Sequence, residues 1–412
     1  MELVYCDRAM TSNKDLLAIV IGRHAREPHI EGGGKVMYEI ARALTQANVK
    51  TYFISFNYYN QWYEYSKKKL CTKDFDSINI STNIISQNTV LNTRAGALIA
   101  NIIEPIKLLK LLSEYKYILK RGKKKSIIVF IGNANKYMDI ILRGIEKIVG
   151  TEGRRILVAL KREDLSFIKI RIIRPHIILT TSREIAYLAK RIYKNKRVVQ
   201  AYSPIDLSIY RPLNRRKICE KIFSELGSDK LLLYIGRVNE LRFPTQTLRY
   251  IALALRGIEK EAKLLIATLP DILSNNWIKR SLELMRKEHL KNVLILPKIL
   301  TIKEKVILMN CSKAFIFPSI GTTAIEPPIT VLEAVACGTP IIATGKSSTR
   351  EIVYATNGYI YSDLSQLQKI LEIVLSSEKN SNLLIARRFA MKHLSFSTFK
   401  AKILGIINYE KE

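Results

Sequence analysis

The chain has 412 residues, of which 48% are hydrophobic and 25% are charged, so its composition is that of an ordinary globular protein. Its 67 lysines and arginines exceed its 36 aspartates and glutamates, and the formal net charge is +31. Such a charge favours anionic partners, namely nucleic acid, an anionic membrane surface or phosphate-bearing small molecules. The first eight residues lack the pattern of a signal peptide and no apolar run is long enough to span a membrane, so we expect a cytoplasmic protein.

The five cysteines are odd in number and far apart in the sequence: Cys6, Cys71, Cys219, Cys311 and Cys337. No pair has the spacing of metal ligands. The pattern therefore predicts neither a disulfide framework nor a structural zinc site.

Short apolar runs alternate with segments of helical periodicity along the first half. The strands expected there are residues 17–22, 51–56, 127–131, 156–160 and 177–179. The helices expected there are residues 35–47, 138–149 and 183–193. Continuous apolar strands between helices are typical of a parallel sheet that is covered on both faces.

The second half repeats this alternation after a proline-containing linker at residues 203–214. Its expected strands are residues 231–235, 263–267, 293–296, 314–317 and 339–343. Its expected helices are residues 245–255, 276–289 and 303–310, followed by two closing helices at 384–392 and 399–409. The fold class is therefore α/β, with two doubly wound Rossmann-like domains and a cleft between the carboxyl ends of their sheets.

A glycine run stands between the first strand and the first helix. Gly33 and Gly34 permit close backbone approach to a ligand, and the helix that follows offers free N–H groups to an anion. A flexible surface turn explains the same residues. The run is neither GxGxxG nor a phosphate-binding Walker loop, which disfavours an NAD-dependent oxidoreductase or epimerase.

Arginines follow the strand at 231–235. The strand ends at Gly236, Arg237 comes next, and Arg242 precedes a helix that Pro244 can open. Two guanidinium groups at this place can clamp a diphosphate. Two solvated arginines are the alternative interpretation.

Two glutamates flank the start of a short helix that is expected from about Thr330 to Gly338. Carboxylates accept hydrogen bonds from sugar hydroxyls, and the N-terminus of the helix can hold phosphate, so Glu326 and Glu333 predict a sugar site. A capping box between Thr330 and Glu333 also fits the spacing.

Residues 107–125 hold eight basic residues and one acidic residue, with leucines at helical spacing. Such a helix can lie on an anionic membrane surface. An ordinary surface helix with solvated lysines fits equally.

Taken in order, these motifs resemble the retaining GT-B glycosyltransferases of the large group 1 family, which use nucleotide sugars. The resemblance rests on the glycine run, Gly236-Arg237 with Arg242, and the stretch from Glu326 to Pro340. It implies an acceptor-binding domain at 1–205, a donor-binding domain at 206–385, and a C-terminal helix at 386–412 that crosses back to the first domain. Six residues separate the two glutamates here, one fewer than in the family pattern.

The resemblance also implies roles for individual residues. Arg237, Arg242 and Glu326 would be catalytic, the arginines on the diphosphate and the glutamate on the transferred sugar. Donor contacts would come from Gly33, Gly34, Gly236, Lys298, Ile299, Ile329, Thr330 and Glu333. Candidates on the acceptor side are His24, Asn133 and Lys136.

These observations predict a hexosyltransferase that moves a sugar from a UDP-, GDP- or ADP-linked donor, without a metal or other cofactor. The expected acceptor is a membrane-anchored lipid carrier or a glycan, and the protein would sit on the inner face of the membrane. A catalytically silent relative that binds a glycan or nucleotide is the alternative. A nucleic-acid-binding protein is disfavoured because the sequence has no recognisable binding module.

Overall fold

The computed structural model describes residues 16–23, 32–56, 76–80, 126–132, 138–149, 153–258, 261–270, 272–321, 323, 325–345, 349–377 and 383–409. The chain divides into two compact units. The first comprises residues 1–201 and 399–412, and the second comprises residues 202–398.

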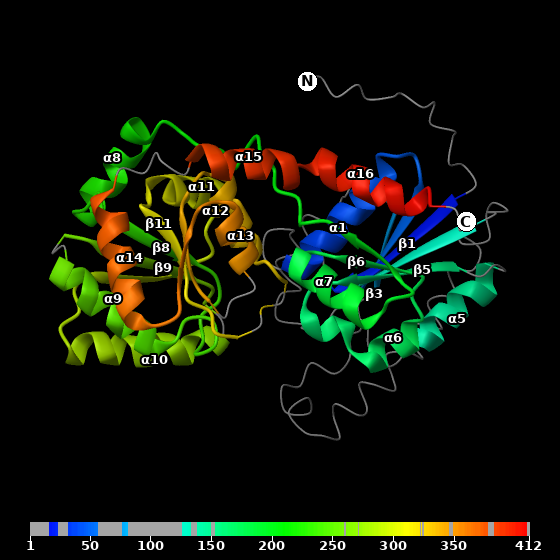
Figure 1. Ribbon diagram of the computed structural model, residues 1–412, viewed down its shortest axis with the longest axis horizontal. Coiled ribbons are helices and arrows are strands. Elements are labelled where there is room, and N and C mark those ends of the chain that lie inside the picture. The colour runs from blue at the N-terminus through cyan, green and yellow to red at the C-terminus, as the bar shows by residue number, and fades with distance from the viewer. Residues whose placement is uncertain are drawn as a thin grey trace. The chain divides into compact units, whose positions relative to one another are not determined.

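The first unit is built on a parallel sheet with the strand order β3-β2-β1-β4-β5-β6-β7 (Figure 1). Its strands are β1 (Leu16–Arg23), β2 (Lys50–Phe56), β3 (Asp76–Ile80), β4 (Ser126–Gly132), β5 (Gly153–Ala159), β6 (Ile177–Thr180) and β7 (Arg197–Gln200). Its helical segments include α1 (Gly32–Thr45), α5 (Met138–Val149), the 3-10 turn η2 (Arg162–Leu165), α6 (Phe167–Ile173) and α7 (Arg183–Ile192).

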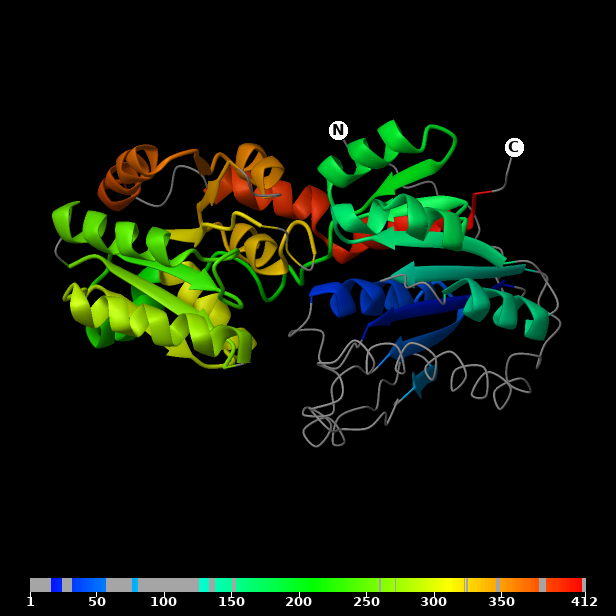
Figure 2. The ribbon, with the colours of Figure 1, turned by 90° about the horizontal axis from the view of Figure 1, so that it is seen from below.

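The second unit has a parallel sheet of order β10-β9-β8-β11-β12-β13. Its strands are β8 (Leu231–Ile235), β9 (Lys263–Thr268), β10 (Val293–Pro297), β11 (Ala314–Phe317), β12 (Ile341–Thr344) and β13 (Tyr359–Tyr361). Its helices are α8 (Arg215–Leu226), α9 (Thr245–Ile258), α10 (Ile272–Lys287), α11 (Ile302–Cys311), α12 (Ile329–Ala336), α13 (Arg350–Ala355), α14 (Leu364–Ser376) and α15 (Leu383–His393). Helices α9 and α10 lie side by side in both views (Figures 1 and 2).

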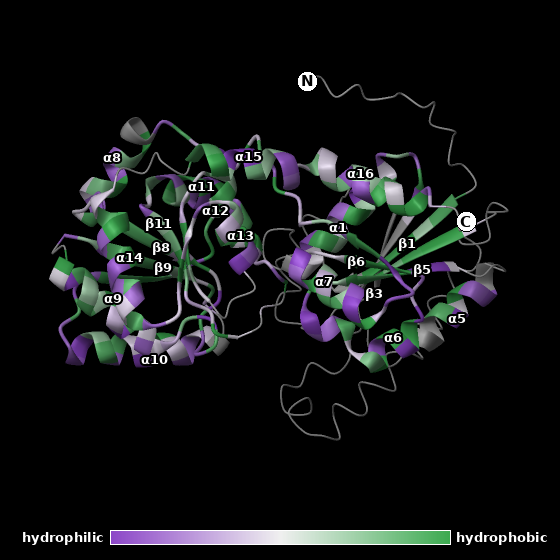
Figure 3. Ribbon diagram, in the orientation of Figure 1, coloured by the Kyte–Doolittle hydropathy of each residue, from purple (hydrophilic) through white to green (hydrophobic). Residues whose placement is uncertain are grey.

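Burial explains why the strands are apolar throughout. All residues of β6, β8, β11 and β12 are buried, as expected for strands that helices cover on both faces. Figure 3 shows the strands as largely hydrophobic, whereas the helices carry hydrophilic residues as well. The prediction of two doubly wound α/β domains is confirmed, and no described helix is long and apolar enough to cross a membrane.

Several element boundaries differ from the sequence prediction because charged side chains enter the strands. Strand β5 begins at Gly153, three residues early, and includes Arg155, whose guanidinium is buried against Glu146 at 2.8 Å. The prediction missed β7, which begins at Arg197, and β3, which begins at Asp76.

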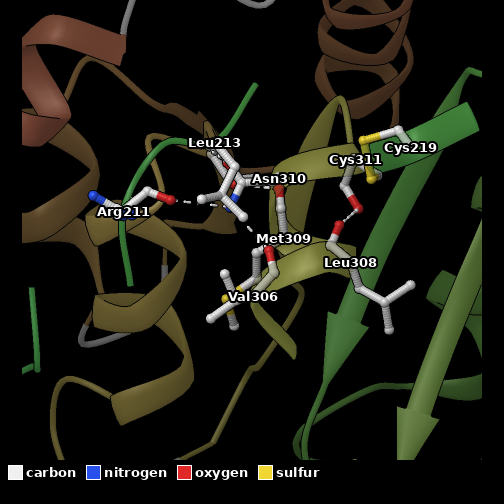
Figure 4. The surroundings of a disulfide bond; sticks show 10 residues. Arg211, Leu213, Cys219, Val306, Leu308, Met309, Asn310 and Cys311 are labelled. Atoms are coloured by element: carbon white, nitrogen blue, oxygen red, sulfur yellow. Dashed lines mark hydrogen bonds between the residues drawn. A yellow bond between two sulfur atoms is a disulfide. The ribbon is translucent and has the colours of Figure 1, made fainter. Parts of the chain in front are cut away.

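The prediction that the cysteines form no disulfide framework is wrong for one pair. Cys219 of α8 and Cys311 of α11 are 92 residues apart in the sequence, but their Cα atoms lie 5.3 Å apart and their sulfurs are bonded (Figure 4). The two helices pack against each other. The spacing of these cysteines in the sequence gives no sign of the disulfide, because the packing of α8 on α11 brings them together.

The chain ends with α16 (Phe396–Ile407), whose final turns pack with the first unit. The Lys402 ammonium donates to the Gln200 carbonyl oxygen at 2.6 Å, and Arg154 donates to the carbonyl of Ile406 at 3.4 Å. These bonds tie the C-terminal segment to β5 and to the end of β7.

Candidate functional site

The strand order of the second unit identifies where a ligand would bind. The chain moves outward from β8 through β9 to β10 and then returns to place β11 beside β8. In doubly wound sheets, ligands bind at the carboxyl ends of the two strands where the order reverses. The loops after β8 and β11 are therefore the expected walls of a site, and they carry Gly236, Arg237, Arg242 and Glu326.

The loop after β8 starts with a conformation that favours glycine. Gly236 has φ +154°, and an added Cβ atom would lie 3.3 Å from the Tyr234 hydroxyl oxygen. That hydroxyl donates to the Arg237 carbonyl oxygen at 2.6 Å. Since Tyr234 is buried among aromatic rings, the backbone at Arg237 is anchored to the core. Burial also raises the pKa of Tyr234.

Arg242 is positioned by a turn that Asn239 organises. The Asn239 side-chain oxygen accepts from the backbone N–H groups of Leu241 at 3.0 Å and Arg242 at 2.9 Å. The next residue, Phe243, is buried, and its carbonyl oxygen accepts from the indole of Trp277 at 2.6 Å. The turn is thus fixed on both sides of Arg242.

The loops after β8 and β11 are bonded to each other through one carbonyl group. The Leu241 carbonyl oxygen accepts from the backbone N–H of Ile320 at 2.9 Å and of Gly321 at 3.2 Å, and from the Ser319 hydroxyl at 3.2 Å. An added Cβ atom at Gly321 would lie 2.9 Å from the Cβ of Leu241, which explains why a glycine stands there. The two walls of the site therefore hold a fixed spacing.

Glu326 and the start of α12 complete this edge of the sheet. Glu326 is buried and is followed by a cis peptide bond to Pro327. Pro328 takes the N-cap position of α12, so Ile329 and Thr330 are its first two residues. The first N–H groups of a helix have no partner within it, so this end can receive an anion. Gly338, with φ +72°, follows the C-cap residue of α12, as predicted.

Glu333 points into a buried polar cluster. The alternative interpretation, a capping box between Thr330 and Glu333, is wrong because Pro328 is the N-cap and Glu333 is the fifth residue of α12. Glu333 and Lys305 are both buried, with 3.8 Å between the Lys305 Nζ and the Glu333 Oε2. Tyr210 also belongs to this cluster, since burial and the charge of Glu333 raise the pKa of its hydroxyl.

Lys298 and Ile299 follow β10 at the same edge of the sheet. The Lys298 ammonium is held by the Glu304 carboxylate, 2.6 Å away, while the Ile299 side chain is exposed. The Lys298 bond and the backbone N–H of Thr301 lower the pKa of Glu304 to about 2. Glu304 and Thr301 form a capping box that starts α11. Lys298 is thus tied to the helix that also carries Lys305.

The predicted glycine run lies in the first unit. Gly33 and Gly34 lie in the first turn of α1, which begins at Gly32 rather than at Lys35 as predicted. An added Cβ atom at Gly33 would lie 3.0 Å from the Cδ1 of Leu160, so the helix start approaches the end of β5 closely. His24, Asn133 and Lys136 lie outside the described residues, as does the basic stretch 107–125.

The structure thus places the candidates of the second unit on loops and helix ends that follow β8, β10 and β11. Sequence reasoning missed Asn239, Lys305 and Tyr210, which hold or face candidate residues. An asparagine three residues before Arg242 is a recognisable turn signal. No local pattern predicted that Lys305 and Glu333 would pair.

The second unit matches a known family. Residues 229–376 match the sequence model described as "Glycosyl transferases group 1". This part of the chain therefore resembles a group 1 glycosyltransferase domain. It contains Arg237, Arg242, Glu326 and Glu333. No curated protein sequence matches the chain.

Solved structures show that the chain has the two-domain GT-B fold. Sucrose-phosphate synthase from Thermosynechococcus elongatus has a TM-score of 0.69 at 14% identity, covering 95% of this chain and 98% of that one. Anabaena HepE in complex with UDP and glucose has a TM-score of 0.66 at 12% identity, covering 95% and 99%. A glycosyltransferase from Rickettsia africae has a TM-score of 0.66 at 15% identity, covering 95% and 97%.

Proposed function

We propose that the protein is a retaining glycosyltransferase that moves a sugar from a nucleoside diphosphate sugar to an acceptor. The proposal rests on two observations: Arg237 and Arg242 follow β8, and α12 starts after β11, the two strands at which the order of the sheet reverses. All of these residues lie in the stretch that matches the group 1 glycosyltransferase model. The solved complexes of HepE with UDP and with UDP-glucose support a nucleotide sugar as donor.

Breaking the bond between a sugar and a phosphate leaves negative charge on the diphosphate. Fixed positive groups that meet this charge lower the barrier more than flexible ones because they need no reorganisation during the reaction. Arg237 is anchored through its carbonyl and Arg242 through its N–H, so both guanidinium groups start from rigid backbone. We assign them to the diphosphate, together with the N–H groups of Ile329 and Thr330.

The carboxylates are assigned to the hydroxyl groups of the donor. A carboxylate accepts several hydrogen bonds, which matches a sugar or ribose diol. Glu326, just before α12, would contact the transferred sugar. Glu333 would contact the ribose, and the exposed Ile299 beside Lys298 would flank the base. Gly33 and Gly34 would close over the donor from the first domain.

The acceptor is proposed to be a membrane-anchored lipid carrier or a glycan, because the net charge of +31 favours an anionic partner. Retention of configuration follows from the resemblance to the group 1 family. Proton NMR of the anomeric centre in the first product formed tests it, since retention and inversion give different coupling constants.

Nucleotide binding tests the donor site directly. Thermal unfolding is measured with UDP, GDP, ADP and their sugar conjugates. A ligand at 100 times its Kd adds about 2.7 kcal/mol to the free energy of unfolding. For a domain of this size we expect a rise in Tm of roughly 5–10 °C with one of the three bases. No rise with any of these nucleotides would refute the proposed donor site.

Substitutions then assign the residues. Arg237→Ala and Glu326→Ala should each lower release of the nucleoside diphosphate from its sugar conjugate by about 100-fold or more. Arg256→Ala is the matched control, because Arg256 is an exposed arginine in the last turn of α9. Wild-type turnover by the Arg237 and Glu326 variants would exclude both residues from the reaction. Nucleotide binding without any turnover by the wild type, whatever acceptor is supplied, would indicate a silent relative.

A further inference from the structure

The outer side of η2, α6 and α7 in the first unit exposes large apolar side chains. Phe167, Ile168 and Tyr187 are each 69% exposed, and with Tyr354 at 68% they are the four most exposed large apolar side chains among the described residues. Ile192, at the end of α7, is 50% exposed. Isolated exposed apolar residues are ordinary, whereas a group of them marks a contact surface.

Two contacts hold α7 beside η2, the turn that leads into α6. Arg162 of η2 forms an ion pair with Glu184 at the start of α7. The Tyr193 hydroxyl, just after α7, donates to the Leu165 carbonyl oxygen at 2.7 Å, two residues before Phe167. Helix α7 therefore lies along the segment that leads into α6.

The opposite sides of these two helices face the sheet. Ile170 and Ile173 of α6, with Ile185 and Ala189 of α7, are buried in one apolar core together with strands β1, β4, β5 and β6. The exposed residues therefore point away from the sheet, and the surface is open to a partner. Figure 3 shows hydrophobic and hydrophilic residues side by side along α6 and α7.

The same surface is strongly positive. Residues 161–197 contain eleven lysines and arginines against three carboxylates, a net charge of +8. Each of the three carboxylates is in an ion pair with a basic residue of the same segment. The exposed cations outside these pairs include Arg171, Arg174, Lys190, Arg191 and Lys194.

We propose that this surface, formed by η2, α6 and α7, docks on an anionic membrane. Lysine and arginine side chains interact with anionic headgroups, while apolar side chains beside them enter the boundary of the acyl chains. A nucleic acid would use the cations and could stack bases on an aromatic ring, but it gives no place to the aliphatic side chains of Ile168 and Ile192. The combination of aliphatic, aromatic and cationic side chains fits a lipid surface better.

Vesicle flotation of the full chain without nucleotide tests the electrostatic part. The wild type should float with vesicles of phosphatidylglycerol and phosphatidylcholine at low salt, and it should be released by about 0.5 M salt. One lysine or arginine near an anionic membrane raises the partition coefficient about fivefold. Lys190→Gln/Arg191→Gln removes two such charges and should therefore lower the partition coefficient about 25-fold. Lys279→Gln/Arg280→Gln on α10 removes the same charge from exposed positions of the other unit and should change it far less.

A second pair of variants tests the contribution of the exposed apolar side chains to membrane binding. Phe167→Ser/Ile168→Ser should lower vesicle binding about tenfold, because burial of such side chains is worth at least that. Tyr354→Ser/Leu384→Ser is the control, since these side chains are 68% and 63% exposed in the second unit. Absence of flotation by the wild type at low salt, or equal losses in patch and control variants, would overturn the proposal. Because no donor is present, this result is independent of the donor-site test.

Discussion

The buried pair of Lys305 and Glu333 gives the sharpest test of how the second unit is held together. Lys305→Met removes the ammonium but keeps most of the aliphatic stem. The Glu333 carboxylate then stays buried without the Lys305 ammonium, whose Nζ lies 3.8 Å from the Glu333 Oε2 in the wild type. Removing one partner of a buried ion pair costs about 3–5 kcal/mol, mainly because the remaining charge is desolvated without compensation.

The expected change is large enough to measure by thermal unfolding. A loss of about 1 kcal/mol lowers Tm by about 2–4 °C for a domain of this size, so Lys305→Met should lower Tm by roughly 6–20 °C. Lys303→Met is the matched control, because Lys303 is an exposed lysine on the same helix, and its Tm should change by at most about 2 °C.

A second substitution separates charge from packing. In Lys305→Met/Glu333→Gln the buried charge is gone, so we expect most of the lost stability to return. All of these measurements are made without nucleotide, so they do not depend on the proposed role of Glu333 toward ribose. Equal Tm values for Lys305→Met and Lys303→Met would refute the reasoning. So would a double variant that is as unstable as Lys305→Met alone.

Three further expectations concern α11 and its neighbours. Thr301→Ala removes the N-cap hydroxyl and should cost about 1 kcal/mol, seen as a lower midpoint in urea unfolding. The pKa of Glu304 is lowered to about 2 from its ordinary 4.5, so its stabilising contribution is present above about pH 4.5 and is lost as the pH falls toward 2. Glu304→Gln should therefore be less stable than the wild type at pH 6 to 7, and the difference should narrow as the pH falls from about 4.5 through 2. A constant difference in stability across this range would contradict the reasoning. Cys219 and Cys311 should resist alkylation in denaturant until a reductant is added, whereas alkylation of both without reductant would show that the disulfide is absent.

Most of the buried strands were predictable because a continuous apolar run is a local signal. Residues 231–235 and 314–317 are continuous apolar runs, and both strands have these bounds in the structure. Gly338 was predictable as the end of α12 for a similar reason, since a left-handed backbone favours glycine. Strands that begin with arginine or aspartate, such as β7 and β3, gave no such signal.

The same distinction applies to the candidate site, where some features were predictable from local sequence and others were not. The residue types near the carboxyl ends of β8, β10 and β11 were predictable, because glycine, arginine and glutamate follow recognisable strands. The pairing of side chains was not predictable, because it arises when the chain folds. In the structure Lys298 pairs with Glu304, Lys305 with Glu333, and Cys219 with Cys311. The last two pairs join residues from different helices that are far apart along the chain, and such contacts depend on how helices pack rather than on any local periodicity.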